Sequence, residues 1–205
     1  MFFIAFASFT TTYCQSSMDY FNSGLAKDEI ADYKGAIADY TKAIELAPNS
    51  AEAYYTRGIA KYNTQDDRGA IADFNKAIEL VPNFDDAYYN RGIAKYNVQD
   101  ERGAIIDHTK AIELNPNYAK AYDNRGDSKF SLQDYKGAIA DFTKAIELNP
   151  NDSKAYHKRG VSKANIQDRK GAIADHTKAI ELNHNYTEAY YNRGVSKMKL
   201  EDGEQ

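Results

Sequence analysis

Apolar residues along this chain recur at the spacing of an α-helix. One such stretch begins after Asp66 and ends before Pro82. Its apolar positions follow the series i, i+1, i+4, i+7 and i+8, and they are Ala70, Ile71, Phe74, Ala77 and Ile78. This series predicts an amphipathic helix with one apolar side. Aspartate is a favoured N-cap residue and proline cannot continue a helix, so both ends of the predicted helix are marked.

The stretch returns at a fixed interval of 34 residues. All four prolines keep this spacing, at Pro48, Pro82, Pro116 and Pro150, and His184 occupies the next place in the series. The sequence Lys-Ala-Ile-Glu-Leu occurs five times in the same phase, without insertion or deletion. Such self-similarity predicts a repeat array.

A second helical pattern lies between these stretches. It reads Asn-x-x-x-Ala-Tyr-x-x-Arg-Gly-x-x-Lys, and in one unit it runs from Asn49 to about Thr64. Asn49 is followed three residues later by Glu52, which predicts a helix start with a capping box at Asn49. Each repeat is therefore predicted to contain two helices.

The interval, the helix pair and these residues together resemble the tetratricopeptide (TPR) family, in a bacterial type with Tyr-x-x-Arg-Gly units. The aromatic residues that match the family pattern in the first helix are Tyr20, Tyr54, Tyr88, Tyr122, Tyr156 and Tyr190. The matching glycines are Gly24, Gly58, Gly92, Gly126, Gly160 and Gly194. The resemblance implies an all-α fold, a right-handed superhelical α-solenoid of stacked antiparallel helix pairs.

The boundaries of the array follow from the interval. Five units are predicted at 17–50, 51–84, 85–118, 119–152 and 153–186, and a terminal capping helix at 187–202. The array then spans 17–202, with an N-terminal apolar segment at 1–16 and a tail at 203–205. The terminal helix is expected to act as the solvent-facing cap that such stacks need.

Basic residues replace two positions that are apolar or aromatic in the family pattern. Arginine precedes the glycine at Arg57, Arg91, Arg125, Arg159 and Arg193, and lysine follows it at Lys27, Lys61, Lys95, Lys129, Lys163 and Lys197. Each second helix carries an aspartate, at Asp39, Asp73, Asp107, Asp141 and Asp175. We predict that the arginines pair with these aspartates in a ladder between helices; the alternative is a ladder that binds anions or RNA.

His108 and His176 replace the aromatic residue of the second helix in two units. These units are not neighbours, and packed helices lie about 8–10 Å apart, so the two side chains are too distant to share a metal ion. Both are predicted to be hydrogen-bonded histidines within the packing layer. No metal site and no cofactor are predicted anywhere in the chain.

The resemblance implies that the first helices line a concave groove that binds a peptide. The residues that we predict for this groove are Tyr55, Ile59, Tyr62, Tyr89, Asn90, Ile93, Tyr96, Asp123, Asp127, Phe130, Lys154, His157 and Lys158. Its early part is rich in tyrosine, its middle is acidic and its later part is basic. Large rigid aromatic residues are favoured at recognition surfaces. The alternative is that the tyrosines pack against neighbouring first helices, and they can do both.

Charge and motifs narrow the classes of function. The net charge is −4 and the sequence pI is about 5.6, which argues against a nucleic-acid partner. Neither a glycine-rich phosphate loop nor a nucleophile–base set is found, so an enzyme is not predicted. The expected function is a non-catalytic protein–protein interaction module or assembly scaffold with a protein or peptide ligand. The alternatives are the regulatory TPR portion of a larger enzyme or complex and an RNA-binding helical repeat. The oligomeric state stays open.

The first residues differ from the rest. Met1 to Cys14 contain no charge and end in small residues, which resembles the second half of a secretory signal peptide with cleavage before Gln15. The expected location is the periplasm or cell envelope, with a truncated gene start accounting for the missing basic residues; the alternative is a cytoplasmic protein with an apolar N-terminus. Cys14 is the single cysteine, so no disulfide forms within the chain, and no segment reaches the length of a transmembrane helix.

Overall fold

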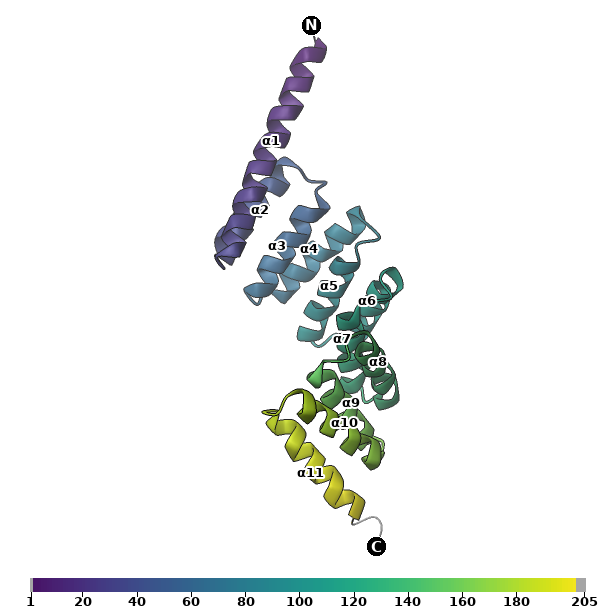
Figure 1. Ribbon diagram of the computed structural model, residues 1–205. Coiled ribbons are helices and arrows are strands. Elements are labelled where there is room, and N and C mark those ends of the chain that lie inside the picture. The colour runs from purple at the N-terminus through teal and green to yellow at the C-terminus, as the bar shows by residue number, and fades with distance from the viewer. Residues whose placement is uncertain (1, 202–205) are drawn as a thin grey trace. The chain divides into compact units, whose positions relative to one another are not determined.

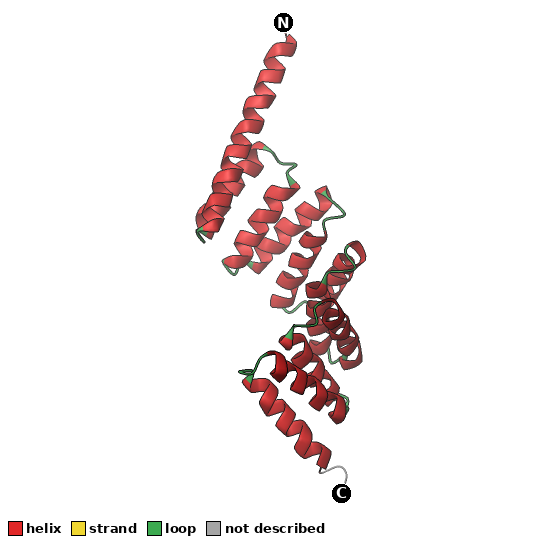
Figure 2. Ribbon diagram, in the orientation of Figure 1, coloured by secondary structure: helices red, strands yellow, loops and turns green. Residues whose placement is uncertain are grey.

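A computed structural model describes residues 2–201 of the chain, and the side chains of residues 16–201. This part of the chain forms eleven helices and no strand (Figure 2). In chain order they are α1 (Phe2–Glu29), α2 (Tyr33–Leu46), α3 (Ala51–Asn63), α4 (Asp67–Leu80), α5 (Asp85–Asn97), α6 (Glu101–Leu114), α7 (Ala119–Ser131), α8 (Tyr135–Leu148), α9 (Ser153–Asn165), α10 (Arg169–Leu182) and α11 (Thr187–Glu201). The predicted all-α fold with two helices in each repeat is confirmed.

The helices form two compact units, one ending at Asp100 and the other beginning at Glu101. In the first unit α1 packs on α2, α3 on α4, and α5 on α4 (Figure 1). In the second unit α6 packs on α7, α7 on α8, α9 on α10, and α11 on α10. Each unit is thus a row of antiparallel helices joined by short turns. The division falls inside the predicted repeat 85–118, so that its two helices, α5 and α6, belong to different units.

The N-terminal segment is part of α1, which is helical from Phe2. The side chains of its first residues, including Cys14, lie outside the described residues, as does the predicted tail at 203–205. Within the described residues, no helix combines the length and apolar character required to span a bilayer.

Aspartate side chains begin the second helices, as predicted. The backbone N–H of Gly69 donates to Asp66 Oδ1 at 3.0 Å, and Gly137 and Asp134 repeat this bond in the second unit at 3.0 Å. The prediction that Asn49 caps the first helix of its repeat is wrong. Ser50 is the cap, because its Oγ accepts from the N–H of Ala53 at 3.2 Å while Asn49 belongs to the turn after Pro48.

The turns between the two helices of a repeat contain a residue with positive φ. These residues are Ala31, Gln65, Gln99, Gln133 and Gln167, with φ between 59° and 65°. The following N–H then reaches back to the helix, as when Asp66 donates to the carbonyl of Lys61 at 2.9 Å. This is the bonding of a Schellman-type helix end, where glycine is the usual residue. Glutamine gave no signal of this conformation in the sequence.

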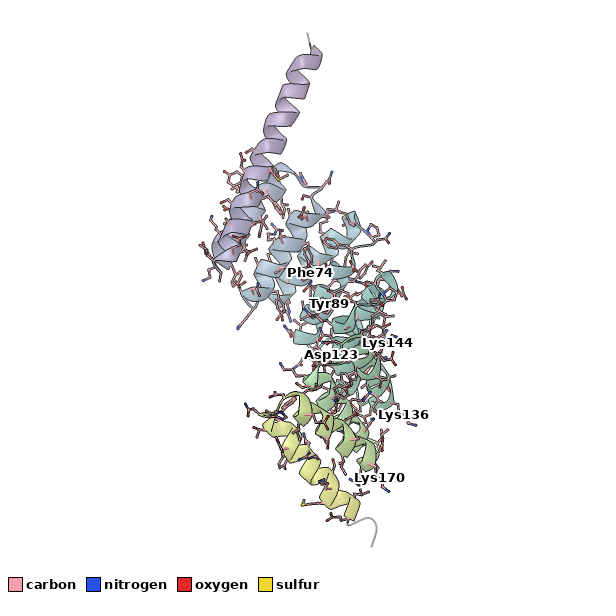
Figure 3. The ribbon with its side chains drawn as sticks, in the orientation of Figure 1. Phe74, Tyr89, Asp123, Lys136, Lys144 and Lys170 are labelled. Atoms are coloured by element: carbon pink, nitrogen blue, oxygen red, sulfur yellow. The ribbon has the colours of Figure 1, made fainter. Side chains whose placement is uncertain are left out.

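An aromatic ring of the second helix packs against the glycine of the first helix. A Cβ atom added to Gly126 would lie 2.7 Å from Cε1 of Phe142, and the same holds for Gly58 and Phe74. Both rings are buried (Figure 3 labels Phe74). The close approach of the two helices therefore requires glycine at this position, because any side chain would collide with the buried aromatic ring.

Candidate functional site

The predicted ladder of arginines and aspartates is present. Arg57 donates to Asp73 through Nε, at 2.9 Å from Oδ2, and through Nη2, at 2.7 Å from Oδ1. Lys61 Nζ lies 2.8 Å from Asp73 Oδ2, so that one nearly buried carboxylate holds two cations. The same arrangement is formed by Arg125, Lys129 and Asp141, and by Arg159, Lys163 and Asp175. These arginines stabilise the repeats.

The ladder also connects each repeat to the preceding one, which the sequence did not predict. Nη1 of Arg57 donates to Thr41 Oγ1 at 3.1 Å, and Arg125 binds Thr109 in the same way at 3.0 Å. The guanidinium of Arg57 also lies over the ring of Tyr54, 5.5 Å from its centroid. Each of these arginines therefore contacts the second helices of two successive repeats.

The tyrosine-rich part of the predicted groove lies in the first unit and contributes to its packing. Tyr55, Ile59 and Tyr62 pack against the buried cluster around Phe74. The hydroxyl of Tyr55 accepts from Nδ2 of Asn90 at 3.0 Å, and burial raises the pKa of this tyrosine to about 12. The remaining predicted residues here, Tyr89, Ile93 and Tyr96, lie on α5 (Figure 3 labels Tyr89).

A small cavity lies in the second unit, among residues of α7, α8 and α9. Its volume is about 160 Å³, and it is lined by Asp127, Phe130, Phe142, His157, Lys158 and Val161. Four of the six belong to the predicted groove. Phe142 was not among the residues predicted for the groove. Lys154 is exposed and does not line this cavity.

The predicted acidic and basic regions of the groove form a single cluster in the second unit. Lys158 Nζ lies 2.7 Å from Oδ2 of Asp123 and 2.7 Å from Oδ2 of Asp127, although these residues belong to different repeats (Figure 3 labels Asp123). Two carboxylates share one ammonium group, so the cluster keeps an excess of negative charge. Oδ1 of Asp123 has no hydrogen-bond partner among the described residues. The cavity is therefore lined by apolar and aromatic side chains together with one carboxylate, Asp127, and one ammonium group, Lys158, and Asp123 pairs with Lys158 from outside this lining.

Burial governs the protonation of this cluster. Burial raises the pKa of Asp127 to about 6, and the charge of Asp123 adds to the increase while Lys158 opposes it. Burial lowers the pKa of Lys158, but the two carboxylates outweigh this effect and hold it above its ordinary value. The carboxyl of Asp127 therefore titrates at about pH 6.

We expect the free energy of unfolding of the Asp127→Asn variant, compared with that of the parent, to be higher at pH 7.5 than at pH 4. The pKa of Asp127 is about 6 when folded, against 3.8 in a model compound, so the folded state binds the proton more tightly. The stability that this carboxyl contributes is full below pH 4 and is lost as the pH rises through 6. The side chain of Asp127 is 31% exposed, so solvent weakens the effect. Between pH 4 and pH 7.5, the difference in the free energy of unfolding between variant and parent should therefore change by only about 1 kcal/mol. Urea unfolding of both proteins at several pH values measures it; a flat difference would contradict the shift.

A second cavity adjoins the first along α9. Its volume is about 200 Å³, it shares Val161 with the first cavity, and it extends past Ala164 to Val195 on α11. The two cavities thus follow the first helices α7, α9 and α11 within the second unit.

The two histidines of the second helices are buried, as predicted, but the prediction of hydrogen bonding is wrong for His176. Neither ring nitrogen of His176 has a hydrogen-bond partner among the described residues. Burial lowers the pKa of His108 and of His176 to about 4, with His157 adding to the effect at His176. The ring centroids of His157 and His176 lie 5.1 Å apart. His176 packs as a neutral ring in the place that Phe142 takes one repeat earlier. The described residues contain no group of three or more His, Cys, Asp or Glu that could hold a metal ion.

Comparison with known proteins assigns the chain to a family. The family model described as TPR repeat matches residues 32–65, 60–99 and 126–166, which together are more than half of the chain. The chain belongs to the TPR repeat family. A comparison with curated protein sequences found no match.

Several solved structures have a similar fold. A crystal structure of MamA protein is 27% identical, with a TM-score of 0.79, over 85% of this chain and 95% of that one. A structure of MamA from Desulfovibrio magneticus RS-1 is 23% identical, with a TM-score of 0.79, over 84% of this chain and 97% of that one. YrrB, which its structure describes as a TPR protein with an unusual peptide-binding site, is 24% identical, with a TM-score of 0.77, over 85% of this chain and 90% of that one. At the lower two identities the likeness concerns the fold alone.

Proposed function

We propose that this chain is a non-catalytic protein-interaction module that binds a segment of a partner protein along α7, α9 and α11. The observation that carries the proposal is the cavity of about 160 Å³, whose mainly apolar lining also includes the charged side chains of Asp127 and Lys158. Pockets for whole small molecules usually measure about 300–1,000 Å³. A cavity of this size instead suits one apolar side chain of a longer ligand.

The adjoining cavity extends the contact. An extended segment with its first anchor beside Phe130 would place a later residue near Val195, over the second cavity. Residues of two successive first helices line the first cavity, so the segment would contact more than one repeat. A segment of this kind gains affinity from a few anchors, with the remaining contacts supplying complementarity.

The charged cluster beside the cavity supports a preference for a positive charge in the ligand. The two carboxylates of Asp123 and Asp127 exceed the single positive charge of Lys158. A lysine or arginine next to the apolar anchor would offset the remaining negative charge of the cluster. Complementary charges of this kind favour encounter and select against acidic segments.

The family is a further reason to test peptides. Repeat solenoids present extended surfaces that commonly serve binding. YrrB has a peptide-binding site by the description of its structure. That property belongs to YrrB, and for this chain it motivates the experiment.

The test is a selection of phage-displayed peptides on the immobilised full chain. We expect the selected peptides to contain an aliphatic or aromatic residue next to lysine or arginine. Val161→Asp places a charge in the cavity and should weaken a selected peptide at least about tenfold, because burying an unpaired charge is costly.

The matched control is Ile106→Asp, at an exposed position of α6 in the same unit. It should leave the affinity unchanged. Thermal melting of both variants shows that each stays folded. Selected peptides that bind Val161→Asp and the parent equally well would remove the cavity from the binding site.

A further inference from the structure

The helix α11 repeats the pattern of a first helix. Tyr190, Arg193, Gly194 and Lys197 occupy the positions that face the second helix of the same repeat in earlier units. The helix packs on α10 and touches α9 (Figure 1), and no described helix follows it. The face that carries these four residues is therefore uncovered in the part of the chain that the structure describes.

The glycine on this face leaves an open space beside the helix backbone, which we call the hollow. A Cβ atom added to Gly194 would meet no described atom within 4 Å, whereas one added to Gly126 would meet the ring of Phe142 at 2.7 Å. Gly194 is exposed, and Gly58, Gly126 and Gly160 are buried. In the earlier repeats, an aromatic ring of the second helix occupies the equivalent position. Tyr190 and Met198 add exposed apolar surface, with 45% and 60% of their areas accessible.

The charges on this face lack the partner that the ladder supplies elsewhere. Arg193 donates to Thr177 Oγ1 at 3.5 Å and lies over the ring of Tyr190, as its equivalents do. Those equivalents also bind an aspartate of their own second helix, but no described carboxylate pairs with Arg193 or Lys197. Two positive charges thus border the hollow at Gly194.

We propose that this face of α11 binds a helix of a partner protein in which an aspartate is followed directly by an aromatic residue. The helix α8 shows the geometry, because Asp141 binds Arg125 and Lys129 while Phe142 packs on Gly126. A partner helix with the same pair of residues would place its carboxylate between Arg193 and Lys197 and its ring on Gly194.

The charge of the face decides between possible occupants. If a second copy of the chain placed the same face against this one, Arg193 and Lys197 would meet their own equivalents. Like charges brought together across an interface repel each other, whereas an acidic helix is attracted. The proposal is independent of the cavities on α7 and α9, because it uses a different face of α11.

The probe is a labelled synthetic peptide with the sequence of residues 134–149, which contains Asp141 and Phe142 in the required order. Fluorescence anisotropy with the full chain measures its binding. The control peptide carries Asp141→Asn and Phe142→Ala. A free peptide of this length is only partly helical, which lowers the affinity of both peptides to a similar extent. The ratio of the two affinities is therefore the readout. We expect the control to bind at least about tenfold more weakly.

Two variants of the chain locate the contact. Gly194→Phe places a ring in the hollow, and the Cβ atom that it adds meets no described atom within 4 Å. Arg193→Glu reverses a charge on the border of the hollow. Each should weaken the probe at least about tenfold, and circular dichroism should show that both stay helical. Equal binding of probe and control peptide, or an unchanged affinity in both variants, would overturn the proposal. Self-association of the parent chain in sedimentation, abolished by Gly194→Phe, would assign the face to a second copy and also overturn it.

Discussion

Replacing Asp141 by alanine is expected to lower the free energy of unfolding by about 3 kcal/mol. Its carboxylate is 5% exposed and holds Arg125 at 2.6 Å and Lys129 at 2.7 Å. Without it, two mostly buried cations face each other with no counter-ion. Removing one partner of a buried ion pair is costly because the remaining charge stays buried. Urea unfolding of the full chain, followed by circular dichroism, measures the change.

The control for this prediction lies on the same helix. Glu147 pairs with Lys144 at 3.0 Å, but both side chains are about half exposed, and such surface pairs contribute less than about 1 kcal/mol. Glu147→Ala should therefore have little effect. A double-mutant cycle of Asp141→Ala with Arg125→Ala should also give a coupling energy above about 1 kcal/mol. Equal effects of Asp141→Ala and Glu147→Ala would mean that the ladder contributes no more than a surface pair.

The ladder shows how far the sequence determined the structure. The spacing of arginine, lysine and aspartate within one repeat predicted pairs such as Arg57 with Asp73, because helix periodicity decides which side chains share a face. The bond from Arg57 to Thr41 was not predicted, since it depends on how one repeat stacks on the preceding one. The same limit applies to the cavity. Phe130 and His157 were predicted from their positions on first helices, but the bridge from Lys158 to two aspartates joins repeats whose stacking the helix pattern does not specify.

The sequence was less informative about helix ends and turns, where more than one residue can adopt the required role. Ser50 and Asn49 can both cap a helix. Asn49 belongs to the turn after Pro48, and Ser50 is therefore the N-cap residue. Gln133 adopts a positive φ where glycine would be expected, so the turn had no marker in the sequence. His176 takes the place of a phenylalanine, and its burial in that apolar environment lowers its pKa, so the ring is neutral. The sequence alone did not show that this histidine would lack hydrogen bonds.

The glycines of the first helices allow the second large effect to be tested with an internal control. Gly126→Ala would place a methyl group 2.7 Å from the ring of Phe142, whose side chain is 1% exposed and has little room to move. Overpacking a core in this way usually costs about 1–3 kcal/mol, and the better helix propensity of alanine recovers up to about 1 kcal/mol. We expect a net loss of about 2 kcal/mol in the free energy of unfolding, together with weaker binding of any ligand whose anchor contacts Phe142.

The same substitution at Gly194 should have the opposite sign. No described atom lies within 4 Å of the added methyl group there, so only the helix propensity changes, and a gain of up to about 1 kcal/mol is expected. Urea unfolding of the two variants therefore compares one substitution at equivalent repeat positions, one under a second helix and one on an uncovered face. If Gly194→Ala destabilised the chain as much as Gly126→Ala, the face of α11 would be covered in solution, and the hollow that we assign to a partner helix would already be filled.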